Sequence, residues 1–485
     1  MVRSIDSYKA VSVSKHSDLP NKVCAEKLSE TYKTAVRVPT QNGGEAFKVF
    51  TNRQIDKIPQ IQSLSSDVRF AMKVVSSILP FRVNEYVINN LIDWSKVPDD
   101  PIFQLTFPQV GMLSPEHFDE IASLISKESP APILNEAIKK VRGDLNPHPA
   151  GQMELNVPTL DGETLQGMQH KYKETVLFFP SQGQTCHSYC TFCFRWAQFV
   201  GDKELKFASH EAKNLHEYLS QNTCVTDLLM TGGDPMVMKT KNLAEYLEPL
   251  SEDPRLEHVQ TIRIGTKSLT FWPQRFVSDN DSDDLIRLLE RLVKSGKHVA
   301  LMAHYNHWRE METEIARKAI KRVQETGTII RSQGPVLAHI NDHEDIWAKT
   351  WTTQVKLGII PYYMFVERDT GARCYFEIPL IQAYEIYRKA LKQVSGLGRT
   401  VRGPSMSSEP GKIEIQGVSN INGEKVFVLR FIQGRNPDWV QKPFFAKYDE
   451  NAKWLNDLTP AFDEQKFFFE DEFSALKESI SLKTV

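Results

Sequence analysis

Three cysteines close together are the clearest pointer to chemistry in this chain. Cys186, Cys190 and Cys193 form a C-x3-C-x2-C pattern. Three thiolates on one tight loop can hold three irons of a cubane cluster and leave the fourth iron without a protein ligand. An open iron can chelate the amino and carboxylate groups of S-adenosylmethionine, and an electron passed into the sulfonium cleaves it to a 5′-deoxyadenosyl radical. The pattern therefore favours a radical-generating [4Fe-4S] site.

The spacing alone leaves two other interpretations open. A structural zinc site requires four ligands, usually in two paired spacings. His187 is poorly placed as the fourth, because it directly follows Cys186. The other interpretation is three reduced, buried cysteines that bind no ligand, which is the more common situation for cysteine in general. The predicted strands and helices on either side of the loop help to choose between these interpretations.

Short β-rich runs alternate with amphipathic helices from about residue 171 to residue 395. The strand candidates are Thr175–Phe179, Thr226–Met230, Val259–Ile264, His298–Met302, Thr328–Arg331 and Gly358–Met364. Apolar residues recur between them at helical spacing, as in Leu285, Leu288, Leu289 and Leu292. Six strand-then-helix units in a row predict an α/β fold with a parallel sheet and right-handed crossovers.

Six units are two short of a full eight-fold barrel. We therefore predict an open, partial (βα)6 barrel over residues 166–395, with a doubly wound open sheet as the alternative. A mostly helical region over residues 1–165 and a C-terminal region over residues 396–485 flank it. In either fold, the active site lies in the loops that leave the C-terminal ends of the strands. The cysteine loop follows the first strand, which raises the cluster interpretation above the other two.

A glycine-rich loop follows the second strand. Gly232, Gly233 and Asp234 come between a hydrophobic run and a helix. Glycines there let the backbone approach a ligand closely, and a carboxylate can accept a hydrogen bond from an ammonium group. Taken alone, the loop is equally an ordinary turn in which Asp234 begins a helix.

Composition excludes several classes of protein. The chain has 485 residues, and Lys+Arg 59 against Asp+Glu 61 gives a net charge of -2, which gives no support to nucleic-acid binding. No apolar run approaches the roughly 18 residues of a membrane span. Six cysteines in so long a chain do not make a disulfide scaffold, and no signal peptide is recognisable at the start. We expect a cytoplasmic protein without membrane or nucleic-acid partners.

The order of the loop motifs resembles the lysine 2,3-aminomutase family of the radical S-adenosylmethionine superfamily. The motifs that follow the cysteine and Gly-Gly-Asp loops in that order are Ile262-Arg263-Ile264-Gly265, Pro273-Gln274-Arg275, His304-Tyr305-Asn306-His307, Ile340-Asn341-Asp342 and Pro361-Tyr362-Tyr363. The similarity covers about residues 50–440. It implies a radical SAM partial barrel, a [4Fe-4S] cluster, S-adenosylmethionine, an electron donor and pyridoxal 5′-phosphate (PLP). In the characterised aminomutases, PLP carries the amine of an amino acid while a radical moves it from the α to the β carbon.

The resemblance assigns roles by position. Cys186, Cys190 and Cys193 would bind the cluster, and Gly232, Gly233 and Asp234 would hold the amino end of S-adenosylmethionine. Arg195 matches an arginine that pairs with the substrate carboxylate, a task suited to its planar fork; the alternative is an exposed surface arginine. Lys171 and Tyr172 align with an Arg-Tyr pair that contacts the PLP phosphate. His304 and His307 would line the cofactor pocket.

The chain departs from the family at the lysine that binds PLP. That lysine follows a run of glycines, whereas the corresponding stretch here is Ser407-Ser408-Glu409-Pro410-Gly411-Lys412, with one glycine. Lys412 is the candidate for the Schiff base with PLP, because a lysine beside a flexible glycine can reach an imine and be released from it. The alternative is a turn at residues 410–412 that presents an exposed lysine to solvent.

A second departure concerns the substrate. Arg368 stands where the family has the first of two aspartates that grip the distal amine of lysine, and Asp369 is one residue further on. An arginine repels an ammonium and attracts a carboxylate or a neutral polar group. We therefore expect an acidic or neutral α-amino acid rather than lysine. No cysteine follows Cys374, so the zinc cluster found between subunits in some aminomutases is not expected, and the oligomeric state is left open.

Two other functions remain to be distinguished. The first is a PLP-independent radical enzyme that abstracts hydrogen from another substrate, including a protein side chain. The second is a non-catalytic iron-sulfur protein, in which the Gly-Gly-Asp and His304 loops would have no purpose.

Overall fold

One mixed sheet organises the part of the chain that the structure describes. The structure is a computed structural model, and it describes residues 47–146, 156–200 and 207–483. Eleven strands lie in the order β15-β14-β13-β12-β11-β10-β9-β8-β7-β6-β5. Its two edges, β5 and β15, are not hydrogen-bonded to each other, so the sheet is open.

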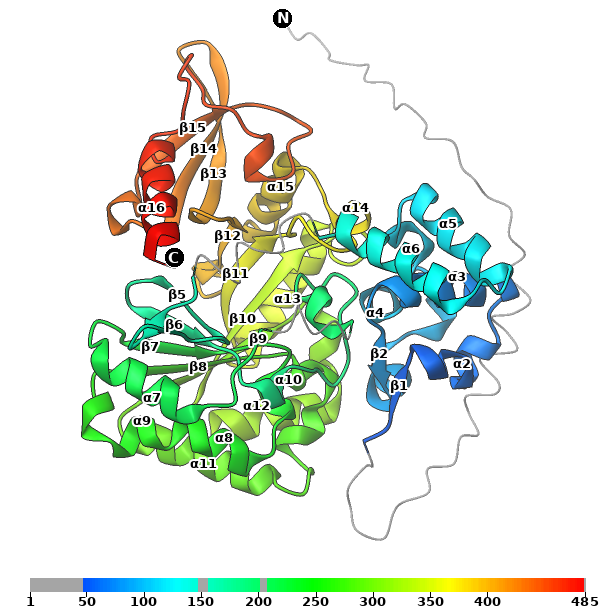
Figure 1. The fold of residues 1–485 in the computed structure, drawn as a ribbon, viewed down its shortest axis with the longest axis horizontal. Coiled ribbons are helices and arrows are strands. Elements are labelled where there is room, and N and C mark those ends of the chain that lie inside the picture. Colours follow the sequence, from blue (N-terminus) through cyan, green and yellow to red (C-terminus); the bar gives the residue numbers. More distant parts are fainter. Residues whose placement is uncertain (1–46, 147–155, 201–206, 484–485) are drawn as a thin grey trace, which may run out of the picture. The chain divides into compact units, whose positions relative to one another are not determined.

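Six consecutive parallel strands form the centre of this sheet, each followed by helix (Figure 1). The strands are β6 (Thr175–Phe178), β7 (Asp227–Met230), β8 (Thr261–Thr266), β9 (His298–His304), β10 (Ile329–Val336) and β11 (Ile360–Val366). The main helices are α7 (Ala212–Gln221), α8 (Thr240–Leu247), α11 (Ser282–Lys294), α12 (Glu314–Gln324), α13 (Glu344–Lys356) and α15 (Leu380–Leu391). All six predicted strands are present, within a few residues of the expected bounds. The predicted α/β class is confirmed.

The strand order decides between the two predicted topologies. A doubly wound sheet reverses its order at a switch point, whereas β6 to β11 follow one another in sequence order. Right-handed crossovers between such neighbours place every helix on the same face of the sheet. The opposite face is left free of these helices. The doubly wound alternative is therefore wrong.

Apolar residues at helical spacing hold the helices against the strands. The four leucines named above in α11 are buried and pack in one core with Leu228, Ile262 and Val299 of β7, β8 and β9. Truncating one such leucine to alanine costs about 2–5 kcal/mol in a packed core. This core fixes the positions of the strand ends and hence of the loops that leave them.

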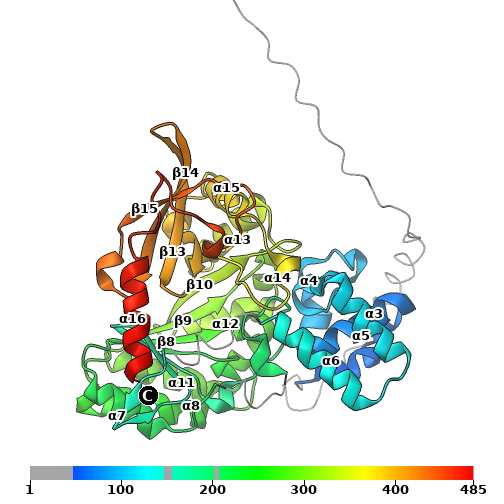
Figure 2. The same ribbon diagram turned by 45° about the horizontal axis from the view of Figure 1, so that its top comes forward.

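The C-terminal region extends the same sheet. β12 (Arg402–Ser407) pairs parallel with β11, and β13 (Gly411–Ile421), β14 (Glu424–Gly434) and β15 (Pro443–Lys447) continue it antiparallel. On the other edge, β5 (Met168–Tyr172) pairs antiparallel with β6. Helix α16 (Glu470–Lys483) runs from the β13–β15 end toward the β5 side (Figure 2).

The region before the sheet is largely helical. Its longer elements are α3 (Ser66–Ile78), α4 (Pro101–Thr106), α5 (Pro115–Ser126), α6 (Ala131–Asp144) and the strand pair β1 (Val49–Thr51) and β2 (Arg82–Asn84). The remaining short elements are α2 (Pro59–Gln62), β3 (Thr159–Leu160), β4 (Glu163–Thr164), α9 (Pro249–Glu252), α10 (Ser268–Phe271) and α14 (Arg373–Phe376). No helix within the described ranges is both long and apolar enough to cross a membrane.

Candidate active site

A cavity of about 980 Å³ opens at the C-terminal ends of the parallel strands. Residues of β5, the strand-end loops, β13, β14 and α16 line it. Its charged lining residues are Lys171, Arg195, Arg263, Glu367, Arg368, Asp369, Glu409, Lys412, Arg435, Glu470 and Lys477. The size is at the upper end for small-molecule sites. The cavity therefore has room for a cofactor together with a substrate.

The three cysteines lie together on the loop after β6, beside this cavity. All are free thiols and partly buried. Burial raises the pKa of Cys186 well above its usual value, and Asp234 and the other two thiols raise it further. Burial also raises the pKa of Cys193 to about 11. Phe192 and Arg195 of the same loop line the cavity wall.

Three thiols on one loop are a donor set that a cubane cluster can use. Within the described ranges, no three His, Cys, Asp or Glu side chains converge where one metal ion would sit. A cubane makes no such demand, because each thiolate binds a different iron. The thiols are nevertheless close enough to influence one another's pKa. Cys186, Cys190 and Cys193 are the residues that would hold the cluster.

The N-terminal region holds the cysteine loop in place. The backbone N–H of Tyr189 donates to Arg82 O (2.8 Å), and that of Thr191 donates to Leu105 O (3.0 Å). The Thr191 hydroxyl donates to Gln104 O (2.8 Å). Because β2 and α4 supply these acceptors, the loop is positioned by chain far away in the sequence.

His187 has a structural place in this loop. Its Nδ1 lies 3.1 Å from Ser268 Oγ, and its ring stacks on Trp272. Burial lowers the pKa of His187 to about 3, so the imidazole is neutral. Its ring is engaged with α10 and the segment after it.

The two glycines after β7 are required by a close approach to the cysteine loop. A Cβ on Gly233 would lie 2.4 Å from Thr185 O, and one on Gly232 would lie 2.2 Å from Gln184 Nε2. Gly232 also has φ +145, which side chains rarely adopt. This close packing by itself explains why both positions are glycine, without any bound ligand. The expected contact with S-adenosylmethionine stays a prediction.

Asp234 joins the loops after β7 and β8. The side chain is 2% exposed, and its carboxylate accepts from Met236 N (2.9 Å), Lys267 N (2.9 Å) and two hydroxyls, those of Thr266 and Ser268 (2.9 Å each). Three of these donors share Oδ2, and only Met236 N donates to Oδ1. Asp234 therefore joins the two loops, and its expected contact with S-adenosylmethionine stays a prediction.

A buried ion pair fixes the next two loops. Lys267 Nζ lies 2.7 Å from Glu310 Oε1, and Glu310 is fully buried. The same ammonium donates to His304 O (3.2 Å) and Asn306 Oδ1 (3.0 Å). His304 consequently faces the cavity, stacked on Phe192. Burial lowers the pKa of His304 to about 3.

His307 does not line the cavity, contrary to expectation. Its Nδ1 accepts a hydrogen bond from the backbone N–H of Arg309 (3.2 Å) and so caps the short helix that follows. Burial lowers its pKa to about 3. His304 therefore lines the cavity, whereas His307 caps the short helix and does not line the cavity.

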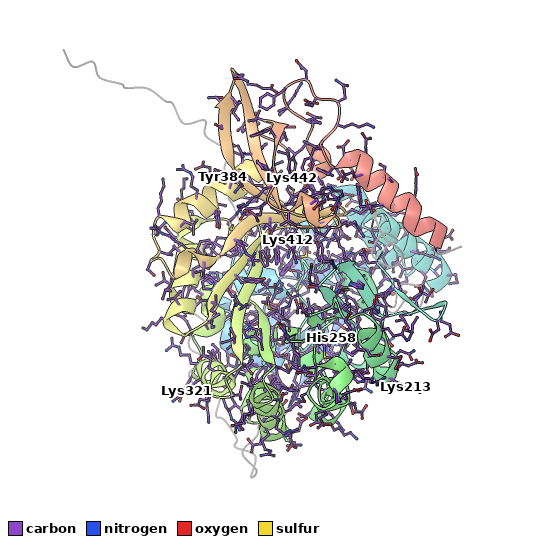
Figure 3. All side chains as sticks on the ribbon, turned by 90° about the vertical axis from the view of Figure 1, so that its left-hand side faces the viewer. Lys213, His258, Lys321, Tyr384, Lys412 and Lys442 are labelled. Carbon is purple, nitrogen blue, oxygen red and sulfur yellow. The ribbon has the colours of Figure 1, made fainter. Side chains whose placement is uncertain are left out.

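Lys412 projects into the cavity from β13. Figure 3 shows it near the centre of the molecule, whereas Lys213 and Lys321 lie at the periphery. Its Nζ is 4.1 Å from the centroid of the Tyr363 ring and 5.5 Å from that of Phe365. Burial lowers the pKa of Lys412 to about 7, and the positive charges of Arg263 and Arg402 contribute. The alternative of an exposed lysine in a turn is wrong.

Sequence reasoning gave no role to the two arginines that act on Lys412. Arg263 is paired with Asp227 (2.5 Å), and Arg402 lies over Tyr362 and Tyr363 (4.8 and 4.7 Å). Arg263 belongs to the Ile262-Arg263-Ile264-Gly265 motif of the family, which is the signal that could have identified it. Arg402 carries no local signal, because only the parallel pairing of β12 with β11 brings it to the site.

Lys171 and Tyr172, at the end of β5, line the same cavity. Lys171 Nζ donates to Ser408 O (2.8 Å). Burial lowers the pKa of Lys171 well below its usual value, and Arg435, Arg368 and Lys412 lower it further. Burial raises the pKa of Tyr172 to about 12. Lys171 thus lies close to Arg368, Lys412 and Arg435, and this group of basic side chains would suit a phosphate.

Two arginines, Arg195 and Arg368, lie against Phe194. Their guanidinium carbons are 5.8 Å and 5.0 Å from its ring centroid. Arg195 is 9% exposed, so it is not a surface arginine. Arg195 Nη1 and Arg368 Nε are buried without a hydrogen-bond partner. Buried polar atoms without partners are rare, and these two groups line a cavity in which a ligand would supply acceptors.

Comparisons with known proteins find relatives that are named lysine 2,3-aminomutases. The chain is 30% identical over 408 residues to the "Putative L-lysine 2,3-aminomutase" of Aquifex aeolicus (strain VF5), covering 84% of this chain and 95% of that protein. It is 24% identical over 437 residues to L-lysine 2,3-aminomutase of Bacillus subtilis (90% and 79% covered), and 23% identical over 404 residues to that of Methanococcus maripaludis (82% and 82% covered).

Two further comparisons add little. No family model matches the sequence. The solved structure of Streptococcus suis SuiB is 13% identical, with a TM-score of 0.33, over 57% of this chain and 56% of that one, a likeness too low to support a conclusion. The 30% identity to the Aquifex protein, over 84% of this chain and 95% of that protein, is decisive. This chain belongs to the lysine 2,3-aminomutase family of the radical S-adenosylmethionine superfamily.

Proposed function

We propose that this protein is an isomerase that moves the amino group of an amino acid other than lysine between carbons 2 and 3, using S-adenosylmethionine, a [4Fe-4S] cluster and PLP. The observation that carries the proposal is the placing of Lys412 in the cavity that also adjoins the cysteine loop. When bound, the cluster with S-adenosylmethionine supplies the radical, and PLP carries the migrating amine.

The residues of the chain fit PLP. Within the described ranges, no carboxylate pairs with the Lys412 ammonium. A pKa of about 7 leaves much of the amine neutral and nucleophilic near neutral pH. A bound phosphate would favour the charged form of Lys171, which would contact it as a point charge rather than with the fork of an arginine. Tyr363 and Phe365 supply flat apolar surface beside Lys412.

Other residues of the chain would bind the substrate and exclude water. Arg195 presents an unpartnered Nη1 that would hold a carboxylate. Phe467, Phe469 and Phe473 near and within α16 line the cavity, and Lys477 of that helix pairs with Glu409 (3.2 Å). A closed, dry site protects reactive intermediates from side reactions.

The test is covalent trapping of PLP. Protein purified anaerobically with PLP would be reduced with borohydride and mapped for a pyridoxyl-labelled peptide. We expect the label on Lys412, its loss in Lys412→Ala, and no change in Lys321→Ala, which removes a lysine whose side chain is 79% exposed. An intact cluster with no label on any lysine would contradict the PLP role. Reductive cleavage of S-adenosylmethionine by that same protein would then identify a PLP-independent radical enzyme.

A further inference from the structure

We infer that the cavity takes an α-amino dicarboxylic acid, with Arg195 holding the α-carboxylate and Arg368 the side-chain carboxylate. The inference rests on the proposed function, and it names the class of substrate. It starts from the two guanidinium groups that lie against Phe194. Each has a buried nitrogen that lacks a hydrogen-bond partner.

The separation of the two groups suits such a ligand. Both distances are measured to one ring centroid, so the two guanidinium carbons are at most about 11 Å apart. A five-carbon dicarboxylate spans about 5 Å between its carboxyl carbons, and a paired guanidinium carbon lies about 4 Å from a carboxyl carbon. A chain of that length can therefore contact both arginines at once, and a four-carbon one is only slightly shorter.

Asp369 directly follows Arg368 and also lines the cavity, but most of the charged residues that line it are basic, and this balance favours an anion over an ammonium. Burial raises the pKa of the neighbouring Glu367 well above its usual value, which disfavours a negative charge on this carboxyl group. Arg195 and Arg368 lie against the same ring, so that two guanidinium groups are held near each other in the cavity wall. Two cations that disfavour each other's charge in a buried site are stabilised by anions placed between them. The ammonium group of a lysine substrate would instead be repelled by both guanidinium groups.

The two arginines have separable roles. A carboxylate on the α carbon is common to all amino acids, so Arg195 contributes to binding of every candidate. Only a dicarboxylic acid has a group for Arg368. Removing the Arg368 guanidinium should therefore abolish the preference for dicarboxylic amino acids. Removing the Arg195 guanidinium should weaken the binding of every amino acid.

Binding of amino acids to the protein loaded with cluster, S-adenosylmethionine and PLP tests this directly, by calorimetry without reductant. The probes are L-glutamate, L-aspartate, L-glutamine and L-lysine. We expect one of the two dicarboxylates to bind at least about tenfold more tightly than L-glutamine and L-lysine. Equal or tighter binding of L-glutamine or L-lysine, or no binding of either dicarboxylate, would overturn the inference without any variant.

Variants assign the residues. Arg368→Gln should weaken dicarboxylate binding by about 10- to 100-fold and leave L-glutamine binding unchanged, and Arg368→Lys should restore part of the loss. Arg195→Gln should weaken all four probes. The matched control is Arg373→Gln at the start of α14, just after the loop of Arg368; its guanidinium pairs with Glu377 (2.6 Å) and does not line the cavity. An unchanged dicarboxylate preference in both Arg368 variants would overturn the role of Arg368.

Failure of this inference is distinct from failure of the proposed function. If lysine or glutamine is the amino acid converted to its 3-amino isomer, the aminomutase function stands and the dicarboxylate inference is wrong. If a dicarboxylate binds through Arg368 but Lys412 takes no PLP and no 3-amino acid forms, the substrate class is right and the proposed reaction is wrong.

Discussion

Lys412 Nζ lies 4.1 Å from the centre of the Tyr363 ring, although β12 separates their two strands in the sheet. The aromatic face takes the place of a carboxylate beside the ammonium. Burial and two nearby arginines lower the pKa of Lys412 from its usual 10.5 to about 7.

This pKa predicts how PLP attachment depends on pH. The neutral amine is the reactive form, so the rate of attachment should rise as the pH increases through about 7 and level off above it. An unperturbed lysine would continue to gain reactivity up to about pH 10. Borohydride trapping from about pH 6 to pH 9 would measure the profile. A rate that still climbs tenfold per pH unit above about pH 8 would contradict the lowered pKa.

Each cluster cysteine should be indispensable. Cys186→Ser, Cys190→Ser or Cys193→Ser removes the thiolate of one iron, and we expect loss of most cluster iron and of S-adenosylmethionine cleavage. Cys224→Ser, which changes an exposed free cysteine, should keep both at the wild-type level. Iron and sulfide analysis of anaerobically reconstituted protein, with electron paramagnetic resonance, would measure this. A full cluster in any of the three variants would remove that residue from the ligand set.

Gly233→Ala should damage the cluster loop. The new Cβ would lie 2.4 Å from Thr185 O and 2.5 Å from Thr185 N, and backbone atoms cannot move aside cheaply. We expect impaired cluster assembly and binding of S-adenosylmethionine weakened by an order of magnitude or more. The control is Gly143→Ala in α6, where a Cβ meets nothing within 4 Å and alanine gains about 0.5–1 kcal/mol of helix stability. Normal cluster assembly in Gly233→Ala would show that the loops can separate.

The buried pair of Lys267 and Glu310 should matter for stability. Lys267→Met leaves the Glu310 carboxylate without its cation, and breaking such a pair lowers the free energy of unfolding by about 3–5 kcal/mol. The exposed pair of Lys294 and Glu290 (2.7 Å) is the comparison, and Lys294→Met should change stability by less than about 1 kcal/mol. Denaturant unfolding under anaerobic conditions would measure both. Equal effects would mean that the buried pair does not hold the two loops.

Local sequence determined the repeating units and most of the site's residue types. The spacing of Leu285, Leu288, Leu289 and Leu292 gave a helix, and the alternation of strand and helix gave a parallel α/β fold, because period and handedness are local properties. The cysteine spacing likewise lies within one loop. These predictions needed no knowledge of distant contacts.

Only the tertiary structure decided what surrounds those residues. The carboxylate of Asp234 accepts four hydrogen bonds from donors in two loops, and the side chain of His307 caps a short helix. Arg402 comes close to Lys412 because β12 pairs with β11. Burial and charge from residues far away in sequence set the pKa of Lys412. The tertiary structure also buries Arg195 Nη1 and Arg368 Nε without hydrogen-bond partners. Such properties depend on which distant segments meet, and local pattern does not encode that.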